Sequence, residues 1–318
     1  TPSITAIRTG DITDALRIVD PTPGVAKGVM APPSIADLTL DGIQDLIVST
    51  FDGRLIALDG RNYSEIWVMD VKEHASGGGI MDAESWSSPA IGYFTDDAVS
   101  DVFTHYVIGA FPMYTGSTSL IVDGATGEIL WLEDTEHTSF TSPLAVNLDG
   151  DGRDEILIAG GDCLTGHDPK SGNELWRWGT WNPTRIGHWR LVPSPVAGDG
   201  VVLACAPKRA PVFAIKAGGK GNISASGRLW NSEGSRDGVS SDVCTPLFYQ
   251  GSFFVLYGEG RDKMLSRVEP KTGKIQWASD LDSRSLFRGS PTGADGQIYV
   301  QKHAGPVPVS DRKQGQGP

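Results

Sequence analysis

Short runs in which apolar and polar residues alternate cover most of this chain, and turns rich in glycine and aspartate separate them. Alternation with a period of two is typical of strands that bury one face. Apolar stripes with the helical spacing of three or four residues are almost absent. The pattern therefore predicts an all-β protein.

The strand pattern recurs six times, and each copy begins with a Ser-Pro, Thr-Pro or Pro-Pro pair. The second residues of these pairs lie 45 to 56 positions apart, at Pro33, Pro89, Pro143, Pro195, Pro246 and Pro291. A fourth strand pattern closes five of the copies with a tryptophan: Trp67, Trp131, Trp176, Trp230 and Trp277. Four short strands in a repeat of this length are the signature of a β-propeller blade.

A blade is too thin to bury both of its faces alone, so neighbouring blades must stack. We expect the recurrent tryptophan to be a wedge between them. Six copies predict a single propeller domain over residues 1–318, with six four-stranded blades in 29–302. The last copy lacks the tryptophan, so a strand from 1–28 is expected to complete it and close the ring. Residues 303–318 are expected to hold the remnant of the last blade and a loose tail, and seven blades are the alternative.

The repeated unit combines Ser-Pro with Asp-Gly, then Leu-Ile-Ala-Leu-Asp, then Thr-Gly followed by Trp. It resembles the PQQ-like repeat of quinoprotein-type propellers. The acidic loops resemble the FG-GAP blades of integrin α chains. PQQ-dependent dehydrogenases of that family carry an adjacent Cys-Cys pair, whereas Cys163, Cys205 and Cys244 are far apart here. The resemblance therefore implies the fold, with no PQQ expected.

Two acidic loops match the FG-GAP pattern Asp-x-Asn-x-Asp-Gly-x-x-Asp, and the match implies structural Ca²⁺, which prefers six to eight oxygen ligands. The matching residues are Asn147, Asp149, Asp151 and Glu155 with the carbonyl of Arg153, and, with one weak ligand, Asp37, Thr39, Asp41 and Asp45. The alternative is a solvated Asp-Gly hairpin turn that needs no ion.

Residues just before the first strand of each blade gather at one mouth of a propeller's central channel. Those positions hold charged and aromatic residues: Glu84, Trp86, His137, Phe140, His188, Trp189, Arg190, Asp242 and Arg288. Arginine can bind a carboxylate by paired hydrogen bonds, and tryptophan can stack on a ligand. The set predicts a binding site, with rim residues satisfied by neighbouring loops as the alternative.

The formal charge of −12 argues against nucleic acid as a partner, because binding to phosphates needs a basic surface. No apolar run is long enough to predict a membrane span. We expect a non-catalytic binding module, secreted, periplasmic or at the cell surface, by analogy with propeller scaffolds of bacterial envelopes. Its ligand would be a protein or a glycan, bound at the channel mouth or the loops around it.

The alternative function is a carbohydrate-active enzyme, a polysaccharide lyase or a glycosidase. Proton abstraction beside a uronate carboxylate needs a base and a cation. His137 or His188 would be the base, and Arg190 or Arg288 would hold the carboxylate. No motif fixes this geometry, so whether the chain is an enzyme stays open.

Overall fold

The computed structural model describes strands separated by short loops, and it divides the chain into two compact units. Unit 1 comprises 1–157 and 167–173, and unit 2 comprises 158–166 and 174–318. The described residues are 5–7, 15–17, 28–74, 83–110, 113–135, 139–148, 150–160, 163–179, 192–206, 211–232, 239–259, 263–302 and 305–309. Among them the only helix is the short 3-10 turn η2 (Val71–Glu73), which is too short to cross a membrane.

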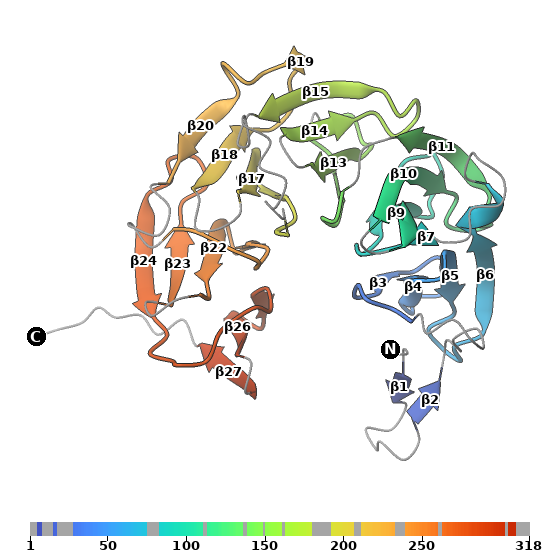
Figure 1. Cartoon of the computed structure of the whole chain (residues 1–318), viewed down its shortest axis with the longest axis horizontal. Helices are drawn as coiled ribbons and strands as arrows, with labels where there is room; N and C mark the ends of the chain where they lie inside the picture. The colour runs from blue at the N-terminus through green and yellow to red at the C-terminus, as the bar shows by residue number, and fades with distance from the viewer. Residues whose placement is uncertain are drawn as a thin grey trace, which may run out of the picture. The chain divides into compact units, whose positions relative to one another are not determined.

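Unit 1 contains antiparallel sheets whose strand order follows the chain, as Figure 1 shows in blue and green. The first blade consists of β3 (Ser34–Ala36), β4 (Asp45–Ser49), β5 (Arg54–Leu58) and β6 (Glu65–Asp70). The second consists of β8 (Ala90–Gly92), β9 (Asp101–Ala110), β10 (Met113–Val122) and β11 (Ile129–Thr135), with β7 (Ala83–Glu84) also paired to β9. The third begins with β12 (Leu144–Val146) paired to β13 (Glu155–Ala159).

Unit 2 repeats the same order. Its strands β14 (Cys163–His167) and β15 (Glu174–Gly179) belong to the third copy, and β19 (Gly221–Asn222) pairs in parallel with β15. The fourth blade is β16 (Val196–Gly198), β17 (Val201–Cys205), β18 (Val212–Lys216) and β20 (Arg228–Asn231). The fifth is β21 (Leu247–Tyr249), β22 (Ser252–Tyr257), β23 (Met264–Val268) and β24 (Ile275–Asp280). The sixth copy forms β25 (Thr292–Ala294), β26 (Gln297–Lys302) and β27 (Gly305–Val309).

The prediction of an all-β chain built from repeated antiparallel sheets is confirmed. Strand β27 shows that the expected remnant of the last blade contributes a third strand to the sixth sheet. The N-terminal strands β1 (Thr5–Ile7) and β2 (Ala15–Arg17) pair with each other. Closure of the last blade by an N-terminal strand would join the two units, and it stays a prediction together with the number of blades.

The hydrophobic core lies between adjacent blades. In unit 1, Ile47 and Leu55 of the first blade share one buried cluster with Val102 and Leu120 of the second. In unit 2, residues of β17 share a cluster with Phe253 and the rest of β22 in the same way. The second strand of a blade is therefore apolar on both faces, and burial of its side chains stabilises the stack of blades.

Trp67 and Trp230 are wedges between blades, as the sequence predicted. The indole of Trp67 donates to the carbonyl of Gly124 in the next blade over 2.8 Å. The indole of Trp230 donates to the carbonyl of Pro270 over 2.7 Å, again one blade further on. Each tryptophan therefore both packs on the neighbouring turn and satisfies a backbone acceptor there.

A relay of hydrogen bonds explains the hydroxyl residues that precede the repeated prolines. The amide of Ser88 donates to the hydroxyl of Ser142 in the next blade over 3.0 Å. In unit 2 the amide of Ser194 donates to Thr245, and the amide of Thr245 donates to Ser290, both over 3.0 Å. The first strands of the second and third copies, and those of the fourth to sixth copies, are thus tied together at the same position.

Candidate functional site

Four aromatic side chains from three consecutive copies meet in unit 1. Phe51 lies between β4 and β5, Trp86 between β7 and β8, Tyr114 on β10 and Phe140 just before β12. The ring centroids of Phe51 and Trp86 are 4.9 Å apart. Those of Phe140 lie 6.0 Å from Trp86 and 5.7 Å from Tyr114. Edge-to-face and tilted contacts at these distances are favourable, and we call this group, with Glu84, the aromatic cluster.

The polar atoms of the aromatic cluster bind one another. The hydroxyl of Tyr114 donates to Oε2 of Glu84 over 2.7 Å and accepts from Nε1 of Trp86 over 3.0 Å. Glu84 is only 3% exposed. Burial, reinforced by the hydrogen bond to the Glu84 carboxylate, raises the pKa of the Tyr114 phenol, so this hydroxyl stays protonated.

Exposed apolar side chains adjoin this cluster. Met113 precedes Tyr114 on β10 and is 77% exposed, and Phe140 is 40% exposed. The position three residues before the repeated proline, occupied by Trp86 and Phe140, holds an apolar side chain in five of the six copies: Met30, Trp86, Phe140, Val192 and Val243. Met30 and Val192 are also exposed. The apolar side chain at this repeated position is therefore exposed in three of the six copies.

The structure brings together part of the predicted channel-mouth set. Glu84 and Trp86 meet Phe140 in unit 1. In unit 2, Arg288 forms an ion pair with Glu259 over 2.9 Å, and Asp242 is half-buried ahead of β21. The remaining members lie outside the described residues: His137, His188, Trp189 and Arg190. A binding role for the whole set stays a prediction.

Sequence reasoning missed Phe51 and Tyr114, because it considered only residues before the first strand of each copy. Both lie where the second strand of a blade turns into the third. An aromatic residue at that turn in two consecutive copies was the available signal.

The predicted calcium loop of the first copy has its own hydrogen-bond partners. Asp45 is almost fully buried at the start of β4 and accepts from the amides of Leu38 and Thr39, at 2.9 and 3.1 Å. Its other oxygen accepts from the amide of Gly60 over 2.8 Å. The carboxylate therefore ties the first loop of the blade to the turn after β5, and we call this arrangement the acid clamp.

The second copy repeats the acid clamp. Asp101 accepts from the amides of Phe94 and Thr95, at 3.1 and 2.9 Å, and from Gly124 over 3.3 Å. Burial raises the pKa of Asp101, although these hydrogen bonds oppose the rise. In the third copy Glu155 accepts from the amide of Leu148 over 2.7 Å. Position 169, which matches Gly60 and Gly124, is a proline without an N–H to donate.

The other carboxylates of the first loop also accept hydrogen bonds in this arrangement. Both oxygens of Asp37 accept from the amides of Asp41 and Gly42. Asp41 accepts from the amide of Ile43 and forms an ion pair with Arg61 over 2.6 Å. A cation would therefore have to compete with a donor at every carboxylate oxygen of the loop, including those of Asp45.

In the third loop the predicted calcium ligand Asp149 lies outside the described residues, so the ligand set there is incomplete. Asn147 accepts from the amide of Gly150 over 2.6 Å, and Asp151 accepts from that of Arg153 over 2.9 Å. Within the described part of the chain, no three His, Cys, Asp or Glu residues are grouped so as to hold a metal ion. The calcium assignments to both loops stay predictions.

No protein-family model and no curated protein matches this sequence. Solved structures do match it. BamB from Moraxella catarrhalis aligns with a TM-score of 0.57 at 17% identity, covering 89% of this chain and 76% of BamB. Sqt1 from Saccharomyces cerevisiae aligns with a TM-score of 0.53 at 10% identity, covering 86% of this chain and 69% of Sqt1.

The quinohemoprotein alcohol dehydrogenase ADHIIG from Pseudomonas putida HK5 also aligns, with a TM-score of 0.51 at 12% identity. The alignment covers 89% of this chain but only 52% of that enzyme, so this chain spans about half its length. Identities this low show the fold alone. The resemblance drawn from the repeats is thereby confirmed: this chain has the β-propeller repeat fold that quinoprotein dehydrogenases and BamB share.

Proposed function

We propose that this chain is a non-catalytic binding module that holds a protein partner against the aromatic cluster. The observation that carries the proposal is the exposure of Phe140 in ring contact with Trp86 and Tyr114, with the exposed Met113 next to Tyr114 along β10. Aromatic residues and methionine are enriched in the cores of protein interfaces, and tryptophan and tyrosine are the commonest hot spots.

The hydrogen bonds inside the cluster favour a protein partner over a glycan. A sugar needs donors and acceptors for its hydroxyl groups as well as a ring on which to stack. The hydroxyl of Tyr114 already binds both Glu84 and Trp86. The cluster therefore offers mainly ring faces, which suit an apolar segment of a protein.

The finer features of the module are also proposals. Six repeats support six blades closed by an N-terminal strand. The analogy with envelope propellers supports a secreted, periplasmic or cell-surface location. The FG-GAP match supports structural calcium in the loop that contains Asn147 and Glu155. Calorimetric titration with Ca²⁺ should give heat with the wild type and none with Asp151→Ala, and equal weak heats in both would exclude calcium there.

Photo-cross-linking tests the partner proposal. A photoreactive phenylalanine analogue at position 113 should give a discrete adduct in cells of the native host. The same analogue at Val68, which is 43% exposed on β6, is the matched control and should give none. Phe140→Ala should remove the adduct at 113, because it removes part of the apolar surface. An adduct that forms equally at position 68, or that persists with Phe140→Ala, would contradict the proposal.

The enzyme alternative stays a prediction. Three of its candidate residues, His137, His188 and Arg190, lie outside the described residues, and the fourth, Arg288, is paired with Glu259. A panel of acidic polysaccharides assayed for new ultraviolet absorbance would detect a lyase, and His188→Ala would identify its base.

A further inference from the structure

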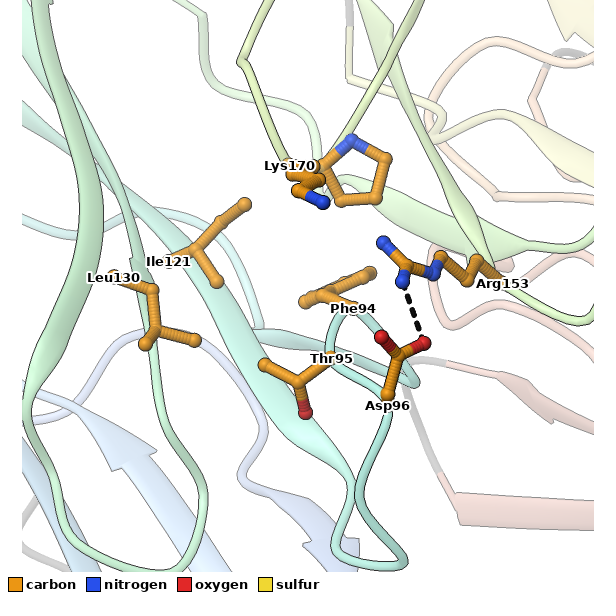
Figure 2. Close-up of a pocket in the computed structure, with 8 residues that line it drawn as sticks. Phe94, Thr95, Asp96, Ile121, Leu130, Arg153 and Lys170 are labelled. Carbon is orange, nitrogen blue, oxygen red and sulfur yellow. Dashed lines mark hydrogen bonds and ion pairs between the residues drawn. The ribbon is translucent and has the colours of Figure 1, made fainter.

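A pocket of about 260 Å³ lies in unit 1 between the second and third copies, apart from the aromatic cluster. It is bounded by the loop before β9, by β10 and β11, and by two turns of the third copy. Its lining residues, shown in Figure 2, are Phe94, Thr95, Asp96, Ile121, Leu130, Arg153, Pro169 and Lys170.

The pocket has one cationic side and one apolar side. Figure 2 shows Arg153 opposite Ile121 and Leu130, with Phe94 between them and Lys170 above. Phe94 and Ile121 are buried, whereas Leu130 at the edge of the apolar side is 46% exposed. A chain with a net charge of −12 thus places an arginine and a lysine at a single cavity.

Contacts between the two copies hold the walls in place. The carboxylate of Asp154 accepts from the amide of Tyr93 over 2.9 Å, and the amide of Asp154 donates back to the Tyr93 carbonyl over 3.1 Å. Thr95 is fixed by Asp101, which accepts from both its amide and its hydroxyl. The loops that carry Arg153 and Thr95 are therefore preorganised.

A single acidic side chain competes for the cationic side. Nη2 of Arg153 lies 2.5 Å from Oδ1 of Asp96, whose side chain is 85% exposed, whereas that of Arg153 is 29% exposed. An ion pair with one partner so exposed contributes little to stability. A ligand carboxylate can replace Asp96, because a guanidinium binds carboxylates in a bidentate manner.

We propose that this pocket binds a small amphipathic carboxylate. Its carboxylate would lie between Arg153 and Lys170, and its apolar part would pack against Phe94, Ile121 and Leu130. Its volume of about 260 Å³ lies just below the roughly 300 to 1,000 Å³ typical of ligand sites, which suits a small ligand. Either a free aliphatic acid or the C-terminal residue of a peptide that ends in an apolar side chain has this chemistry.

Calorimetric titration of the full chain with octanoate tests the proposal. Octanoate should bind, while octanamide, which lacks the charge, and inorganic phosphate, which lacks the apolar part, should bind at least tenfold more weakly. Equal binding of octanamide would show that the cations are not used. Equal binding of phosphate would show a simple anion site. Either result, or no binding of octanoate and of the peptide probe below, would overturn the proposal.

Variants locate the binding. Arg153→Gln and Lys170→Met should each weaken octanoate at least tenfold, and Asp96→Asn should strengthen it severalfold because the competitor is neutralised. Arg61→Gln is the matched control, since Arg61 forms an equivalent pair with Asp41 in the first copy, and it should change nothing. Lys170 has no ion pair among the described residues, so Lys170→Met keeps the test valid if Arg153→Gln unfolds. Unchanged affinity in Lys170→Met would sink the proposal.

A peptide arm distinguishes the two sources of the ligand. An acetylated hexapeptide that ends in leucine with a free carboxylate is compared with the same peptide amidated at its C-terminus. Tighter binding of the free-acid peptide than of octanoate identifies a protein terminus as the ligand, and the reverse identifies a free acid. If the amidated peptide binds as well as the free-acid peptide, the carboxylate site is contradicted.

Discussion

The indole ring of Trp131 occupies the space that a side chain at position 172 would need. A Cβ atom on Gly172 would lie 2.1 Å from the ring, and the φ of +70° at this glycine is one that other residues rarely adopt. The tryptophan belongs to the second copy and the glycine to a turn of the third. Trp131 can therefore pack at this position only because residue 172 is a glycine, and the contact depends on both residues.

Gly172→Ala should destabilise unit 1 by about 2 to 4 kcal/mol, because overpacking adds about 1 to 3 kcal/mol to the cost of a positive φ. Gly42→Ala is the matched control, since Gly42 has a φ of +83° with no atom within 4 Å of its Cβ position. That control should lose only about 1 kcal/mol. Midpoints of urea unfolding measure both, and equal losses would show that Trp131 does not press on this turn.

The same pairing occurs wherever a copy with the tryptophan precedes a regular turn. A Cβ on Gly127 would lie 2.8 Å from Trp67, and one on Gly273 would lie 2.6 Å from Trp230. The first copy has Tyr63 at the equivalent position, at a φ of 63°. Glycine is thus retained where a neighbouring indole needs the space.

Asp45→Ala should cost about 3 kcal/mol of stability, because it leaves the amides of Leu38, Thr39 and Gly60 without their acceptor in a buried site. The loss should be the same with and without added Ca²⁺, since the acid clamp needs no ion. Denaturant unfolding in calcium and in chelator gives both values. A destabilisation seen only in calcium would mean that the first loop is a metal site after all.

The repeats made the strands and the wedges predictable, because apolar alternation and the spacing of the tryptophans follow from local geometry. The acid clamp was only half predictable. Asp45 stood out as an acidic loop residue, but its donors include Gly60, which lies 15 residues away in another turn. Strand β19 was not predicted, because its pairing with β15 depends on a partner 45 residues distant and its own sequence is rich in glycine.

The aromatic cluster was the least predictable feature. Trp86 and Tyr114 are 28 residues apart, and nothing local in the sequence indicates that the Trp86 indole donates to the Tyr114 hydroxyl. Such contacts arise only when the turns of consecutive copies are packed side by side. A repeat pattern gives the positions of turns along the chain, whereas tertiary packing decides which turn residues meet.

Asp52 should make stability depend on pH in the acid range. Burial alone would raise its pKa, but hydrogen bonds from Arg54 and Thr50 and the charge of Arg54 outweigh burial and lower it. A lowered folded-state pKa contributes stability above the unfolded value of about 3.9, and that contribution is lost as pH falls through the folded-state pKa.

Asp52→Asn should therefore cost about 2 kcal/mol at pH 7, the size of a charge-assisted hydrogen bond, and much less at pH 2.5. Urea unfolding at the two pH values measures the difference. Glu65→Gln, at an exposed position of β6, should show little difference at either pH. A cost for Asp52→Asn that does not shrink in acid would mean that its charge does not stabilise the fold.

Tyr114→Phe should separate the stabilising and binding roles of the aromatic cluster. The substitution keeps the ring but removes the hydroxyl that donates to buried Glu84 and accepts from Trp86, so about 1 to 3 kcal/mol of stability should be lost at pH 8. The raised pKa of Tyr114 means that the folded state holds the phenol proton more tightly than the unfolded state. That contribution is complete below the unfolded value of about 10 and is lost as pH rises from there through the raised folded-state pKa, so the advantage of wild type over variant should be smaller at pH 11 than at pH 8. Tyr93→Phe, at an exposed tyrosine, is the control and should match the wild type at both pH values.

Because the ring faces persist, the cross-link at position 113 should survive in Tyr114→Phe, and its loss would show that the hydroxyl itself contacts the partner.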